Sequence, residues 1–210
     1  MKYLAILLLL ATPAAALGPV SFTGWDDIKF PFLRANDYAG FENRMEIRSE
    51  GAVSITWMQL GAEFHHAEAA SWRWSVSASV PPTDLAQDGG DDRNISVYFV
   101  FADDETTARA ERGASLSRVL NGEDVRVLLY TFGGEVAGVE IDSPHLAPRG
   151  KIMVRRAAGT GAFSEDVDLR GDLGRAFGTT EKNLIGIAIS ADSDDTDTVI
   201  EASVADLVLR

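Results

Sequence analysis

Apolar and polar residues alternate with a period of two along most of this chain, and only short stretches have the spacing of an amphipathic helix. Clusters of Gly, Asp, Asn and Pro, such as Pro81-Pro82 and Gly133-Gly134, interrupt the alternation at short intervals. Such a pattern predicts an all-β fold, a two-sheet antiparallel β-sandwich of the jelly-roll kind. The predicted strands are residues 28–32, 44–49, 52–58, 72–77, 94–101, 125–132, 151–156, 165–169, 184–191 and 199–209.

Two stretches depart from the alternation and predict short helices in the connecting loops. Residues 106–120 are rich in Ala, Arg, Glu and Leu, which favour helix. Residues 172–178 predict one or two helical turns, with Asp172 as the N-cap and Gly178 as the C-terminal stop.

The first sixteen residues have the layout of a cleavable secretory signal peptide. The cationic start Met1-Lys2 is followed by an apolar run too short to cross a bilayer, and Ala14 and Ala16 precede the predicted cut. We therefore expect residues 17–210 to form a single β-sandwich domain that is periplasmic or secreted. That part has no second apolar run of spanning length, so no membrane insertion is expected. The chain contains no cysteine, so the fold depends on its apolar core without disulfides.

The formal net charge of −13 excludes some partners and favours others. Nucleic acid and anionic membranes are poor partners for so acidic a chain, because like charges repel. A neutral ligand, a cation or a basic partner is compatible with this charge, although solubility alone also explains it. The oligomeric state stays open.

Several motifs recur in an order that is typical of one family. They are Trp72-Arg73-Trp74-Ser75-Val76, then Gly90-Asp91-Asp92 before an apolar strand, then residues 172–178, 185–197 and 205–209. Together they resemble domain-of-unknown-function family 3047 over nearly the whole exported chain. The resemblance implies an exported bacterial β-sandwich of the broad kind that includes carbohydrate-binding modules. It implies no particular activity and no catalytic residues.

The aromatic strand at residues 72–77 is the first candidate for ligand binding. Trp72, Trp74 and Val76 share one face of this strand, and Arg73 and Ser75 share the other. The two tryptophans either belong to the core or form a platform on which a sugar ring stacks. Arg73 either pairs with an acidic residue or forms hydrogen bonds to a ligand's hydroxyl or carboxylate groups.

The acidic loop that follows the predicted strand 184–191 is the candidate metal site. Carboxylates placed so closely repel one another unless they are solvated, protonated or bridged by a cation, and oxygen ligands of this kind suit calcium. The alternative is a solvated turn in which Asp side chains cap backbone amides. Asp91 and Asp92 are further ligand candidates and could join the loop if the fold brings the two together. The predicted metal ligands are Asp192, Asp194, Asp195 and Asp197.

Catalytic motifs are sparse. Thiol chemistry is excluded, and neither a zinc-binding His-Glu-x-x-His motif nor a Gly-x-Ser-x-Gly nucleophile elbow occurs. Glu140 and Asp142 share one face of a possible strand and are the acids a glycoside hydrolase would use. We expect a non-catalytic binding module for a carbohydrate or another envelope ligand. A structural or assembly protein of the envelope and a glycoside hydrolase are the alternatives.

Overall fold

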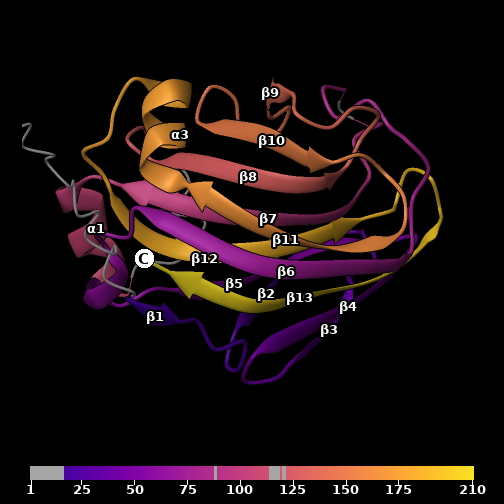
Figure 1. Cartoon of the computed structure of the whole chain (residues 1–210), viewed down its shortest axis with the longest axis horizontal. Helices are drawn as coiled ribbons and strands as arrows, with labels where there is room; N and C mark the ends of the chain where they lie inside the picture. The colour runs from indigo at the N-terminus through magenta and orange to yellow at the C-terminus, as the bar shows by residue number, and fades with distance from the viewer. Residues whose placement is uncertain (1–16, 88, 114–118, 120–121) are drawn as a thin grey trace, which may run out of the picture.

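The computed structural model describes residues 17–87, 89–113, 119 and 122–210 of the chain. The predicted signal peptide, residues 1–16, lies outside the described residues. The described chain forms two stacked β-sheets, with its helices at the end of the sandwich where the C-terminus lies (Figure 1). Within the described ranges, no helix is long and apolar enough to cross a membrane.

One sheet has six strands and the other seven, and nearly all neighbouring strands are antiparallel. Strands β8 and β10 are the exception, because they pair in parallel. The six-stranded sheet runs β11 (Gly161–Asp168), β6 (Ala69–Ala78), β13 (Val199–Leu209), β4 (Arg44–Glu50) and β3 (Asp37–Gly40), with β1 (Gly18–Pro19) paired to β13. The seven-stranded sheet runs β2 (Asp26–Lys29), β5 (Val53–Gln59), β12 (Asn183–Asp192), β7 (Arg93–Ala102), β8 (Arg126–Gly133), β10 (Gly150–Arg156) and β9 (Glu140–Asp142).

The predicted sandwich of the jelly-roll kind is confirmed, with adjustments at the ends of strands. Strand β2 lies earlier than predicted and ends at Lys29, so residues 30–32 belong to the following loop. Strand β11 begins at Gly161 and gives way to a helix at Leu169. The short strands β1 and β3 have too few residues for an alternating pattern to reveal them.

Among the elements of the described residues, two short α-helices and one 3₁₀ turn, η1 (Ala62–Phe64), lie in the connections. Helix α1 (Asp104–Glu111) begins two residues before the predicted segment, because Asp103 caps it by accepting a hydrogen bond from the Thr106 amide. Residues 114–118 and 120 of that prediction lie outside the described residues.

Helix α3 (Leu169–Phe177) begins one turn earlier than the sequence predicts. The prediction of Asp172 as its N-cap is wrong, because Asp168 accepts the capping hydrogen bond from the Gly171 amide, at 2.8 Å. Asp172 instead lies inside the first turn and accepts a hydrogen bond from the Tyr130 hydroxyl. Gly178 ends the helix as predicted, in the left-handed conformation that a residue without Cβ adopts readily.

The main core lies between the two sheets and contains the aromatic strand. Trp72 and Trp74 are each 2% exposed, and their rings pack against one another and against Phe99, Tyr130 and Phe132. Burying several such large rings supplies much of the favourable free energy of folding. Both indoles are therefore core residues and offer no exposed face on which a ligand could stack.

Strands β7 and β12 of the seven-stranded sheet are buried on both faces, which explains why they are almost continuously apolar in sequence. Val97 and Phe99 of β7 point into the core between the sheets. Tyr98 and Val100 alternate with them and join a second apolar cluster on the outer face. Helix α1 contributes Ala110 to that cluster, so only part of the outer face is left open.

Candidate functional site

A groove of about 570 Å³ lies on the outer face of the seven-stranded sheet. Its floor comes from alternate residues of adjacent strands, since residues two apart in a strand share a face. Val53, Ile55 and Trp57 of β5 lie beside Ala188 of β12, which pairs with Trp57 on one side and Tyr98 on the other. Phe30 and Leu33 from the loop after β2, and Leu146 from the loop after β9, form the walls. Most of the lining is therefore apolar.

One end of the groove holds a buried cluster of charges around Arg93, which we call the Arg93 cluster and define as Asp91, Arg93 and Asp192. Arg93 begins β7 and lies opposite Asp192, which ends β12, in the antiparallel register. Its Nη1 donates to Asp91 Oδ2 at 2.9 Å and to Asp192 Oδ2 at 3.0 Å. Its Nη2 donates to the hydroxyl of Tyr98 at 3.1 Å. The three charged side chains are at most 8% exposed.

Burial shifts the pKa of Asp192, one of the two carboxylates that share the single guanidinium of the Arg93 cluster. Burial raises the pKa of Asp192 to about 9, opposed by Arg93 and reinforced by the nearby carboxylates of Asp194 and Asp92. Within the described part of the chain, neither Asp192 Oδ1 nor Arg93 Nε has a hydrogen-bond partner. A buried polar atom without a partner is uncommon in a folded protein, so this end of the groove has unused hydrogen-bonding capacity.

His145 extends the cluster toward solvent. Its Nε2 lies 3.2 Å from Asp91 Oδ2, and its side chain is half exposed. Ser143 and His145 belong to the loop after β9, which forms one wall of the groove. A role for this histidine could not be predicted from local sequence, because its partner Asp91 is more than fifty residues away.

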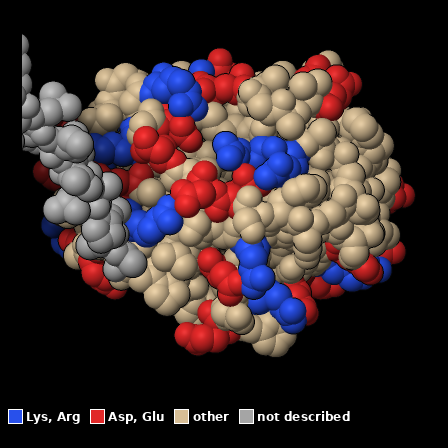
Figure 2. All heavy atoms as spheres, viewed as in Figure 1, with Lys and Arg blue, Asp and Glu red and all other residues tan. Residues whose placement is uncertain are grey.

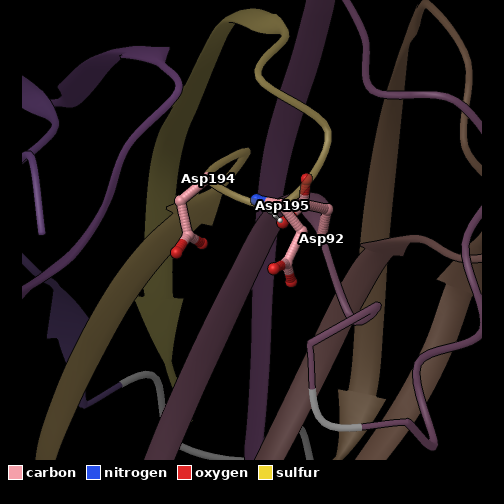
Figure 3. A group of neighbouring side chains, drawn as sticks. All are labelled: Asp92, Asp194 and Asp195. Atoms are coloured by element: carbon pink, nitrogen blue, oxygen red, sulfur yellow. Dashed lines mark hydrogen bonds between the residues drawn. The ribbon is translucent and has the colours of Figure 1, made fainter.

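The acidic loop lies next to Asp92, so these two segments can share one site. Asp92, Asp194 and Asp195 each place a carboxylate oxygen within 4.8 Å of the others, so these three residues could hold one metal ion (Figure 3). We call them the Asp92 group. Asp92 is fully buried and already accepts hydrogen bonds from the amide and hydroxyl of Thr196. Asp92 thus also stabilises the turn by accepting hydrogen bonds from it, which is similar to the alternative of a turn whose backbone amides are capped by Asp side chains.

The other two predicted metal ligands lie outside the Asp92 group. Asp192 faces Arg93 and belongs to the Arg93 cluster. Asp197 has a left-handed backbone with φ of 49° and places its carboxylate against Gly51. The structure therefore brings together two of the four predicted ligands and adds Asp92 to them.

Arg73 is exposed on the outer face of the six-stranded sheet, away from the groove. It forms an ion pair with Asp206 of β13, and the neighbouring Ser75 shares a hydrogen bond with Ser203. On the face seen in Figure 2, basic and acidic side chains interleave without a continuous patch of one sign. Arg73 is thus paired structurally, which is one of the two roles its position allowed.

The predicted carboxylate pair for glycoside hydrolysis lies on the edge strand β9. Glu140 pairs with Arg175 of α3 at 3.3 Å, and Asp142 pairs with Lys151 of β10 at 2.7 Å. Neither residue lines the groove. Both acids therefore have basic partners and lie outside the lining of the groove.

Arg93 and Tyr98 were not predicted from the sequence as site residues. Trp57 is buried, but it packs in the outer cluster and lines the groove. One signal was available for Arg93, because an arginine at the start of a strand with no other charge needs a buried partner. The identity of that partner depends on the pairing of β7 with β12, which the sequence does not display.

Comparison with known proteins gives a family and a distant structural likeness. No curated protein sequence matches the chain. Among solved structures, a meso-active, thermostable cellulase derived from that of Rhodothermus marinus is similar, with a TM-score of 0.42 and 13% identity. The match covers 89% of this chain and 95% of the cellulase. A family model described as "Protein of unknown function (DUF3047)" matches residues 23–208, which agrees with the resemblance seen in the motifs. The chain therefore belongs to the DUF3047 family of proteins of unknown function.

Proposed function

We propose that this protein is a non-catalytic binding module whose ligand lies in the groove on the outer face of the seven-stranded sheet. The observation that carries the proposal is the groove itself, about 570 Å³ in volume, mainly apolar and with a few polar groups gathered at one end. Small-molecule sites commonly have this size and this composition. The rigid strands of the floor favour binding, because little ordering is needed when a ligand enters.

The lining indicates a ligand with a substantial apolar body. Aliphatic side chains of β5, β7, β8 and β10 offer dispersion contacts and few partners for hydroxyl groups. The burial of Trp72 and Trp74 removes the stacking platform on which a carbohydrate ligand was expected. Trp57 is the tryptophan that remains available in the groove. A glycan is therefore included as a test ligand and not as the proposed one.

Export places the module outside the cytoplasm in this proposal. The composition of residues 1–16 supports a cleaved signal peptide and a periplasmic or secreted protein. Components of the envelope are then the available ligands. The sequence of the purified protein's N-terminus tests this part, and an N-terminus at Leu17 is the expected result.

The groove is tested by filling it. Ala188→Leu adds a larger side chain between Trp57 and Tyr98, and Val136→Leu places the same side chain on an exposed loop as the control. The wild-type protein and the control are expected to bind the neutral apolar dye Nile red with a change in Trp57 emission. Ala188→Leu is expected to lose that binding while keeping its circular dichroism spectrum. Equal dye binding by all three proteins contradicts the proposed site.

Calcium is a second candidate ligand, and the close carboxylates of the Asp92 group are the observation that favours it. An ion bound only by the folded state stabilises that state by mass action. Thermal melting in calcium is therefore expected to occur several degrees above melting in chelator. Asp194→Asn is expected to abolish the difference, whereas Asp197→Asn, outside the Asp92 group, is expected to keep it. Equal melting temperatures in calcium and chelator rule out a calcium site of useful affinity.

A further inference from the structure

We infer that the ligand of the groove carries a positively charged amine at one end of its apolar body. This inference rests on the proposed binding function and adds the chemical class of the ligand. The groove is apolar along the floor formed by β5, β8 and β10 and charged where β7 begins and β12 ends. A molecule that fills it must therefore match one charged end and one apolar body.

The charged end of the groove is acidic. Its lining has more carboxylates than cationic groups, and all of them gather around the start of β7 and the end of β12. Even without Asp192, the three carboxylates of Asp91, Asp194 and Asp195 face one guanidinium and one imidazole, so this end of the groove has more acidic than basic side chains. The charged residues of the lining are Asp91, Arg93, His145, Asp192, Asp194 and Asp195.

Arg93 is poorly placed to attract an anionic ligand. Nη1 of Arg93 already donates to Asp91 and Asp192, and Nη2 donates to Tyr98, which leaves the buried Nε as its nitrogen without a partner among the described residues. Its charge is thus shared by two carboxylates at about 3 Å. An incoming carboxylate or phosphate would approach Asp194 and Asp195 as well, and like charges at that distance disfavour binding.

Asp192 supplies the second observation that points to a ligand. The residue is 6% exposed, lines the groove, and has a carboxylate oxygen that lacks a hydrogen-bond partner within the described residues. A primary ammonium has three N–H donors and a full positive charge, so it can offer a donor to Asp192 and neutralise the surplus of acid. A neutral hydroxyl offers a donor without neutralising that charge.

The test compares head groups on one tail. Octylamine, octanol, octanoate and octyl glucoside are titrated into the full protein by calorimetry in chelator near neutral pH, with Trp57 emission as a second signal. Octylamine is expected to bind at least about tenfold more tightly than octanol, a difference of about 1.4 kcal/mol. Octanoate is expected to bind more weakly than octanol. The advantage of octylamine is expected to shrink as salt is added, since salt screens the exposed acids.

Matched variants assign the effect to the acidic end. Asp194→Asn is expected to reduce the advantage of octylamine over octanol several-fold. Asp142→Asn on the edge strand β9 makes the same chemical change at a residue that pairs with Lys151 and does not line the groove, and no effect on either ligand is expected.

The possible outcomes separate the inference from the proposed function. If all four compounds bind equally, or if octyl glucoside binds most tightly, the amine inference is wrong and the groove remains a binding site. If none binds and Trp57 emission never changes, the proposed function fails and the inference fails with it. A dimer in sedimentation that binds none of the compounds would mean that a second copy covers the groove, which also overturns the inference.

Discussion

Asp192→Asn is expected to change how the stability of this protein depends on pH. Asparagine keeps the shape of the side chain and an oxygen that can accept from Arg93, but it does not titrate. An aspartic acid in an unfolded chain has a pKa of about 3.9, whereas burial raises the pKa of Asp192 in the folded protein to about 9. Between these values the folded state holds a proton that the unfolded state has released. Stability is therefore lost as the pH rises.

The size of the effect follows from the linkage between protons and folding. One proton of difference lowers the free energy of unfolding by about 1.4 kcal/mol for each unit of pH. From about pH 5.5 to about pH 7.5, the wild type is expected to lose up to roughly 2.7 kcal/mol relative to Asp192→Asn. Urea denaturation at several pH values, carried out in chelator, measures this difference by linear extrapolation.

A control and a clear refutation exist for this prediction. Asp142 has a side chain that is 64% exposed and pairs with Lys151, so Asp142→Asn is expected to show nearly the same pH dependence as the wild type. A difference between wild type and Asp192→Asn that stays constant with pH, or that grows in the wild type's favour as the pH rises, refutes the assignment of a raised pKa to Asp192.

Three further changes test particular contacts. Asp92→Ala removes the acceptor of two hydrogen bonds from Thr196 and is expected to lower the free energy of unfolding, measured by urea denaturation, by about 1–3 kcal/mol. Hydrogen exchange at the Thr196 amide is expected to become faster. Unchanged exchange at this amide would contradict the role of Asp92 in the turn. Gly186→Ala puts a Cβ into the indole of Trp57 and is expected to cost about 1–3 kcal/mol and to shift tryptophan emission. Asp168→Ala is expected to cost about 1 kcal/mol through loss of the α3 cap, and no loss in urea denaturation would reject it as the cap.

The local sequence was sufficient to predict most strands of the sandwich. The alternation in Trp72-Arg73-Trp74 placed both indoles on the side opposite Arg73, and the structure buries them there. Gly178 ended a predicted helix because few other residues adopt a left-handed conformation without strain. In each case the physical cause lies within a few residues of the feature it determines, so a single sequence displays it.

The candidate site was harder to predict because its residues meet only through strand pairing. Asp192 was predicted as a metal ligand from its acidic neighbours, yet its register opposite Arg93 makes it part of an ion pair. Likewise, Asp92 joins Asp194 only because β7 and β12 lie side by side. A one-residue shift in that register would turn these side chains to the other face of the sheet. The register cannot be predicted from amino-acid composition.

Strands β7 and β12 build the floor of the groove with one face and the main core with the other. A substitution in the floor that improves a new ligand's fit therefore also disturbs the packing that keeps the two sheets together. Phe30, Leu33 and Leu146 line the groove from loops, outside the strands that form the main core. If the groove binds ligands as proposed, adaptation within this family is expected to proceed by exchange of wall residues and loop lengths, while the floor changes slowly.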